Sequence, residues 1–131
     1  MSNIKAFLKQ NVKQGEKVVD FKVSDRFEET IKLKKLSGED LFTLQDKTSY
    51  TDENGMNKSD IKAFASSLMV ACIEEPDLLN AELLESYGVL TPHQLINEMF
   101  EGDEYMHVFN KCSKLNGLNK TLKDLEKEAK N

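Results

Sequence analysis

Tryptophan is absent from this sequence of 131 residues, and arginine, cysteine and proline are scarce. Arg26 is the one arginine, which argues against a site that clamps phosphate or carboxylate groups. Cys72 and Cys112 show no spacing typical of a disulfide framework or a metal site. We therefore expect two buried, reduced thiols.

Long apolar runs are also missing. The longest, from Leu68 to Ile73, is far shorter than the ~20 residues that a membrane-spanning helix needs. The first residues contain no apolar block of signal-peptide length. We therefore expect a cytoplasmic protein that has no membrane partner.

Basic residues are distributed unevenly along the chain. The stretch 63–110 has no lysine or arginine but nine acidic residues. By contrast, residues 1–62 hold 12 basic and 11 acidic residues, and residues 111–131 hold six lysines and three acids. Two explanations stay open at this point: a solvated acidic face, or an acidic docking surface for a basic partner.

Residues 1–50 predict a short helix followed by an antiparallel β-hairpin. Apolar residues at i, i+3 and i+4 from Ile4 indicate an amphipathic helix. Two runs, 18–23 and 30–34, then alternate apolar and polar residues, as in strands with one buried face. The register that we expect pairs Phe21 with Ile31 and Asp20 with Lys32.

A second short helix should follow, with Ser37 as its N-cap and Asp40 at its third position. Leu41 and Leu44 would face the core. The segment 51–58 is rich in turn-forming residues, and we expect a loop there.

The second half of the chain predicts a series of helices. The first should run from about residue 59 to residue 74, before Pro76. Its spacing places three side chains on one buried face: Phe64, Leu68 and Cys72. The next should cover about 78–87, with Leu79, Leu83 and Leu84 inward and Gly88 as a left-handed cap.

Two further helices and a helical tail complete the prediction. One begins with Thr91 as N-cap and Pro92 at the first helical position. Another runs over about 103–116, and its predicted inward side chains are Met106, Phe109 and Leu115. The tail places Leu118, Leu122, Leu125 and Ala129 on a narrow apolar stripe.

These elements predict one α+β domain over residues 1–131, in which an N-terminal antiparallel β-hairpin packs with a mainly α-helical C-terminal half. Its parts are an α/β-hairpin part (1–50), a loop (51–58), a helical part (59–117) and a helical tail (118–131).

Two helices around Gly88 also occur in DNA-binding helix-turn-helix units. A DNA-reading helix needs lysine and arginine to approach the phosphates. The helix that follows Thr91 has neither residue, and it carries Glu98 and Glu101. We therefore predict a packing unit and no nucleic-acid partner.

Few residues suggest chemistry. Glu104 and His107 have the helical spacing of a di-iron site, but the second copy that such a site needs is missing. A cysteine–histidine nucleophile pair stays open, although no cation lies near Cys72 in the sequence to activate it. Glycine-rich phosphate loops and nucleophile elbows are absent. We predict no enzyme activity, no metal and no cofactor.

Several short motifs together resemble a known family. They are Pro76 followed by Leu78, Glu82-Leu83 leading into Ser86-Tyr87-Gly88-Val89, Leu95, Met99, Glu104-Tyr105 and Leu115-Asn116-Gly117. Near the N-terminus, the stretch from Ile4 and the Ser24-x-Arg26-Phe27 step also fit. On these motifs the chain resembles the XkdN-like phage tail assembly chaperones from about Ile4 to Leu118. It departs from them in lacking tryptophan after the hairpin and in having Asp103 between Gly102 and Glu104.

The resemblance implies a non-enzymatic helper of tail assembly in the bacterial host cell, from a contractile-tailed phage or a phage-derived tail element. Proteins of this kind are thought to coat the tape-measure protein before tail-tube subunits polymerise around it, and to be absent from the finished particle. The implied partners are the tape-measure protein and a frameshift-extended form of the chain itself. The alternative is a structural tail connector that stays in the particle.

A partner-binding surface would combine the acidic stretch with the tail stripe. The candidate residues are Glu98, Glu101, Leu118, Leu122 and Leu125. The stripe either packs on the acidic half of its own chain or waits for a partner to cover it. Deletion of residues 121–131 should leave the fold intact and weaken binding to the tape-measure protein.

Overall fold

A computed structural model describes residues 4–13, 15, 17–118 and 127. The first hairpin consists of β1 (Val18–Phe21) and β2 (Ile31–Lys34), which pair antiparallel. Phe21 lies opposite Ile31 and Asp20 opposite Lys32, so the predicted register is confirmed. Alternation buries Ile31 and Leu33 on one face of the sheet.

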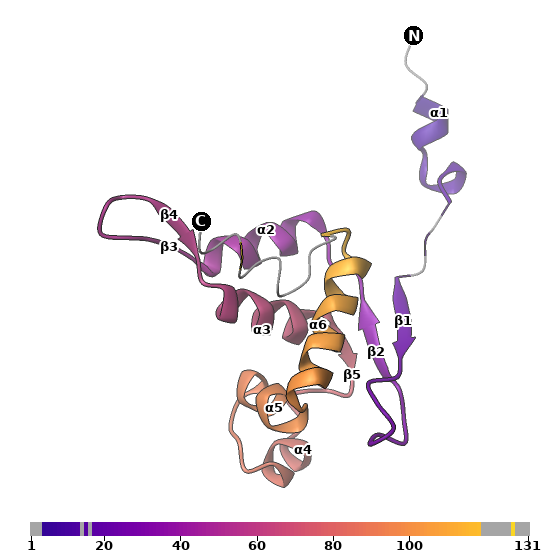
Figure 1. Cartoon of the computed structure of the whole chain (residues 1–131). Helices are drawn as coiled ribbons and strands as arrows, with labels where there is room; N and C mark the ends of the chain where they lie inside the picture. Colours follow the sequence, from indigo (N-terminus) through magenta and orange to yellow (C-terminus); the bar gives the residue numbers. More distant parts are fainter. Residues whose placement is uncertain (1–3, 14, 16, 119–126, 128–131) are drawn as a thin grey trace.

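A third strand, β5 (Ile73–Glu75), pairs antiparallel with β2 and gives the sheet the order β1-β2-β5. The prediction that a helix continues to residue 74 is therefore wrong. Helix α3 (Ile61–Cys72) ends two residues earlier, and the chain turns directly into the strand (Figure 1). The apolar run at this boundary is buried in both the helix and the strand, so its composition does not show where one ends.

Helix α2 (Gly38–Lys47) begins as predicted, since the Ser37 side chain accepts a hydrogen bond from the Asp40 N–H. Leu44 is buried and Leu41 is half-buried against the core. The predicted loop 51–58 is mostly a second hairpin instead, made of β3 (Ser49–Thr51) and β4 (Asn57–Ser59).

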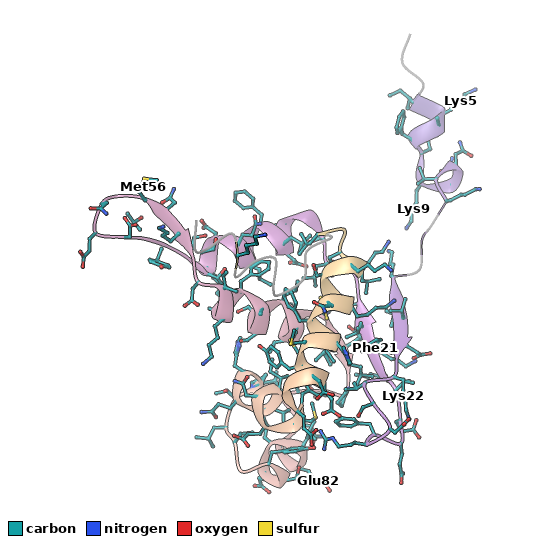
Figure 2. The ribbon with its side chains drawn as sticks, viewed as in Figure 1. Lys5, Lys9, Phe21, Lys22, Met56 and Glu82 are labelled. Atoms are coloured by element: carbon teal, nitrogen blue, oxygen red, sulfur yellow. The ribbon has the colours of Figure 1, made fainter. Side chains whose placement is uncertain are left out.

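The turn of this second hairpin is held by one carboxylate. Asp52 Oδ1 accepts hydrogen bonds from the Asn54 and Met56 N–H groups, both at 2.9 Å. Gly55 takes the left-handed conformation with φ 78°. The turn chemistry of the segment was recognised, but its short polar strands carry no apolar alternation that would predict a hairpin. Figure 2 shows Met56 at the tip of the hairpin, away from the body.

Helix α3 forms the centre of the molecule, with the Asp60 side chain as its N-cap. Leu68, Met69 and Cys72 are fully buried, while Phe64 is half-buried against the core. The predicted apolar face of this helix is therefore confirmed. It packs against α5 (Pro92–Met99) and α6 (Gly102–Leu115).

Helix α4 (Ala81–Ser86) starts later than predicted, because Asn80 is its N-cap and residues 77–80 form a turn. Leu79 lies in that turn and is 73% exposed, so the prediction that it faces inward is wrong. Gly88 ends the unit in the left-handed region with φ 67°, as predicted. Thr91 then caps α5, because its side-chain hydroxyl oxygen accepts a hydrogen bond from the Gln94 N–H.

Helix α6 buries Phe109 and packs Leu115 half-buried against the core, as predicted. Val108, Phe109 and Cys112 are fully buried, but Met106 is 42% exposed, so the prediction that Met106 faces inward is wrong. Gly117 ends the helix with φ 72°. Leu118 follows and packs half-buried against the core. The remainder of the predicted tail stripe lies outside the described residues.

The N-terminal residues stand apart from this body (Figure 1). Helix α1 (Ile4–Phe7) and the 3-10 turn η1 (Lys9–Asn11) lie beyond the β1 edge of the sheet. None of the described residues from Ile4 to Val12 is buried. Among the described residues, no helix is long and apolar enough to cross a bilayer.

Candidate partner-binding site

A buried carboxylate fixes the loop of the first hairpin to the start of α6. Glu104 is 2% exposed and accepts hydrogen bonds from Arg26 Nε at 2.9 Å and from the Glu101 N–H at 2.8 Å. It also accepts hydrogen bonds from Arg26 Nη2 and the Ser24 hydroxyl. The Arg26 guanidinium, with Ser24 and the Glu101 N–H, lowers the pKa of Glu104 from 4.5 to about 2.

Arg26 also reaches the end of α5, because its Nη2 donates to the Met99 carbonyl oxygen at 3.0 Å. Its guanidinium lies 5.0 Å from the centre of the Phe27 ring. Phe27 in turn packs edge-on against Phe100, with ring centroids 5.9 Å apart. The single arginine thus holds the corner between α5 and α6 in place, and Phe100 with it.

Phe100 is one wall of a groove of about 590 Å³ between α3, α5 and α6. Its lining residues are Ile61, Lys62, Ala65, Asn97, Phe100, Gly102, Tyr105 and Met106. Most of this lining is apolar, and the exposed side of Met106 belongs to it. A groove of this kind can bury apolar side chains of another segment, with little capacity for chemistry of its own.

Two exposed acids, Asp103 and Glu98, are sequence neighbours of lining residues, and we call this pair the acidic rim of the groove. Asp103 is exposed and lies one helical turn before Met106, on the same side of α6. Glu98 is exposed next to Asn97 at the end of α5. Lys62 is the one basic side chain among the residues that line the groove.

Two of the predicted site residues are sequence neighbours of residues that line the groove, although neither lines it. Glu98 follows Asn97, Glu101 lies between Phe100 and Gly102, and both are exposed. Glu101 Oε1 lies 3.6 Å from Arg26 Nε. Leu118 is elsewhere, half-buried against the core. Leu122 and Leu125 lie outside the described residues.

Sequence reasoning missed the residues that form the groove itself. Ile61 and Ala65 are at helical spacing with the buried positions of α3, and this spacing predicts ordinary core residues. Met106 was assigned to the core for the same reason. Helical spacing identifies an apolar face, but it does not show which part of that face another element covers.

A second cluster connects the far end of α6 to the segment after β2 and to the end of α3. Asn116 Oδ1 accepts a hydrogen bond from the Leu36 N–H at 2.7 Å. The Asn116 Nδ2 group donates hydrogen bonds to Cys72 Sγ at 3.2 Å and to the Cys112 carbonyl oxygen at 2.9 Å. Both cysteines are free and buried, as predicted. The Cys72 thiol and burial raise the pKa of Cys112. This environment disfavours the Cys112 thiolate that a nucleophile needs.

The two histidines do not join these clusters. His93 Nδ1 lies 2.6 Å from the Ser66 hydroxyl, and His107 is exposed on α6. In the described part of the chain, no three side chains of the metal-binding types gather at one point. The features that stand out are therefore the groove, its acidic rim and the carboxylate network behind it.

Comparison with protein families matches residues 4–130 to the phage XkdN-like tail assembly chaperone proteins. The chain belongs to this family. The XkdN-like motifs that are far apart in the sequence meet in the structure, because Ser24 and Arg26 of the hairpin loop bind Glu104 of α6.

A curated relative of this chaperone is the phage-like element PBSX protein XkdN of Bacillus subtilis strain 168. The two are 32% identical over 73 residues, which cover 55% of this chain and 49% of the relative. The matched region thus spans about half the length of that protein. The crystal structure of the protein yqbn has the same fold, with a TM-score of 0.71 and 19% identity, over 89% of this chain and 98% of that one.

Proposed function

We propose that this tail assembly chaperone binds the tape-measure protein during tail morphogenesis and is absent from the mature particle. The observation that carries the proposal is the apolar groove between α3, α5 and α6 with its acidic rim. Its family supplies the general role, which is assistance in building a phage tail. The groove supplies a place where a client segment can bind.

A tape-measure protein is long and largely helical, so it exposes apolar stripes before the tail tube surrounds it. Such stripes aggregate unless another surface covers them. An amphipathic helix binds a groove through apolar side chains at i, i+3, i+4 and i+7. The lining around Phe100, Tyr105 and Met106 fits this mode, and the acidic rim favours a client helix flanked by lysine or arginine.

No step of this function requires catalysis, and we propose a binding protein that acts in the cytoplasm of the bacterial host. A frameshift-extended form of the chain would carry the same groove and is a second candidate partner in the assembly complex. Release should follow when tube subunits compete for the same apolar stripe, because an open groove with a charged rim binds reversibly.

Co-expression with the tape-measure protein followed by affinity capture tests the proposal. Met106→Lys places a cation in the groove and should reduce capture at least tenfold. Leu90→Lys is the matched control, since Leu90 is 87% exposed and does not line the groove. Equal capture by both variants and the unmodified chain would exclude the groove as the client site.

Absence from the particle is tested separately by mass spectrometry of purified tails. We expect the chaperone in the assembly lysate and no stoichiometric copy in the finished tails. A structural connector would instead be retained, in a fixed number of copies per particle.

A further inference from the structure

The N-terminal arm, defined here as residues 4–13, exposes an apolar face. Phe7 is 78% exposed, Ile4 62%, Val12 44% and Leu8 39%. Three hydrogen bonds that shape the arm are local: Leu8 N–H donates to the Lys5 carbonyl, Asn11 N–H to the Leu8 carbonyl and Asn11 Nδ2 to the Lys5 carbonyl. The arm therefore has a defined shape, while its apolar side chains remain open to solvent.

The same arm is basic. Lys5, Lys9 and Lys13 lie within it, and it contains no acidic residue. Figure 2 shows Lys5 and Lys9 at the opposite end of the molecule from Glu82 of α4. The segment 63–110, which supplies most of the groove and the acidic rim, has no lysine or arginine at all. One molecule thus carries a basic apolar segment and, at a separate place, an apolar groove with Lys62 in its lining and the exposed acids Glu98 and Asp103 next to lining residues.

We propose that the arm of one copy docks in the groove of a second copy of this chain. Phe7 and Leu8 would insert between Phe100, Tyr105 and Met106, while the lysines face Glu98 and Asp103 on the rim. The volume of about 590 Å³ lies in the range of sites that enclose a few side chains. Burial of apolar surface drives the contact, and the opposite charges select its orientation.

A second copy fits better than the arm's own groove. Figure 1 shows the arm beyond β1, on the far side of the sheet and α6 from the start of α3. Only residues 14–17 separate the arm from β1 in the sequence, which limits how far the arm can reach from that edge of the sheet. A second copy can approach the arm from any side, so its groove is not subject to this limit.

The inference rests on the proposed function in one respect, since arm and client would occupy the same groove. Docked arms would cover both apolar surfaces while the tape-measure protein is absent. Client binding would then displace the arm. The chaperone would protect itself from aggregation in the same way that it protects its client.

A charge-exchange experiment on the full chain tests this arrangement, with molecular mass measured by sedimentation velocity. The arm variant carries Lys5→Glu, Lys9→Glu and Lys13→Glu, and the rim variant carries Glu98→Lys and Asp103→Lys. All five side chains are exposed, and circular dichroism checks that each variant is folded. The unmodified chain should self-associate as its concentration rises.

Each variant alone should lose that association, because arm and groove then carry charges of the same sign. A mixture of the two should regain it, since the unmodified arm of the rim variant fits the unmodified groove of the arm variant. A monomeric unmodified chain, an arm variant that associates normally, or a mixture that stays monomeric would each overturn the proposal.

Client capture separates this inference from the proposed function. The arm variant keeps the groove, so it should capture the tape-measure protein at least as well as the unmodified chain. If capture fails for every form while the charge exchange restores association, the client proposal is wrong and the arm contact stands. If capture succeeds and the unmodified chain never associates with itself, the client proposal stands and the arm contact is wrong.

Discussion

Leu68 lies at the centre of α3 with no exposed surface, where it packs between the helices and the sheet. Leu68→Ala should lower the free energy of unfolding by roughly 2–5 kcal/mol, because it removes buried apolar atoms and leaves a cavity. Urea denaturation measures the change. Leu90→Ala provides the control: the Leu90 side chain is 87% exposed, and its loss should change stability by less than about 0.5 kcal/mol.

Glu104 should make stability depend on pH. Its pKa of about 2 in the folded state lies below its ordinary value of 4.5, so the folded state favours the ionised carboxylate. This contribution is complete above about pH 5 and is lost as the pH falls towards 2. We therefore expect Glu104→Gln to lower the urea midpoint clearly at neutral pH and less at about pH 3.

Glu98→Gln is the matched control for that measurement, because Glu98 is exposed and makes none of the contacts of Glu104. Its urea midpoint should follow that of the unmodified chain at both pH values. If Glu104→Gln behaved in the same way, the Arg26–Glu104 network would contribute nothing to stability.

At the scale of elements, the break between α4 and α5 depends on one backbone conformation. Gly88 has φ 67°, and a Cβ atom there would meet no neighbour within 4 Å. Gly88→Ala should therefore destabilise the protein through backbone strain alone, by about 1 kcal/mol. Gly38→Ala tests this point, because Gly38 opens α2 with equal space and no positive φ. It should be neutral or slightly stabilising.

Elements with strong local signals could be predicted from the sequence. The register of β1 and β2 follows from alternation, and Ser37 and Thr91 cap their helices as predicted. The strand β5 could not be predicted, since Ile73 is buried whether it continues a helix or pairs with Leu33. Only the position of β2 decides between the two.

The acidic stretch is visible in the sequence and the groove is not, and the role of Glu98 and Glu101 in partner binding stays a prediction. Glu98 and Glu101 were identified because the acidic stretch is visible in the sequence. The groove beside them depends on how α3 meets α6, which local spacing does not specify. The contact of Arg26 with Glu104 joins residues 78 positions apart, and neither residue alone indicates its partner.

At the scale of the whole molecule, apolar surface and charge are arranged together. The body buries one continuous core from Val23 to Cys112, while the arm and the groove leave apolar side chains open. The arm is basic, whereas the exposed acids Glu98 and Asp103 are neighbours of groove residues, among which Lys62 is the one charged side chain. An exposed apolar surface that is bordered by charge can bind and release partners without aggregating.

The salt dependence of client capture should reflect this arrangement. If the acidic rim attracts a basic client helix, raising the salt from about 0.05 M to about 0.5 M should weaken capture, because salt screens exposed charges.

Glu98→Gln with Asp103→Asn removes rim charge while keeping side-chain size, so capture by this double variant should be weaker at low salt and nearly independent of salt. Binding through apolar contact alone predicts the opposite for the unmodified chain: capture that is unchanged or slightly stronger as salt increases. Titration of purified chaperone with a tape-measure segment, followed by calorimetry at both salt concentrations, distinguishes the two.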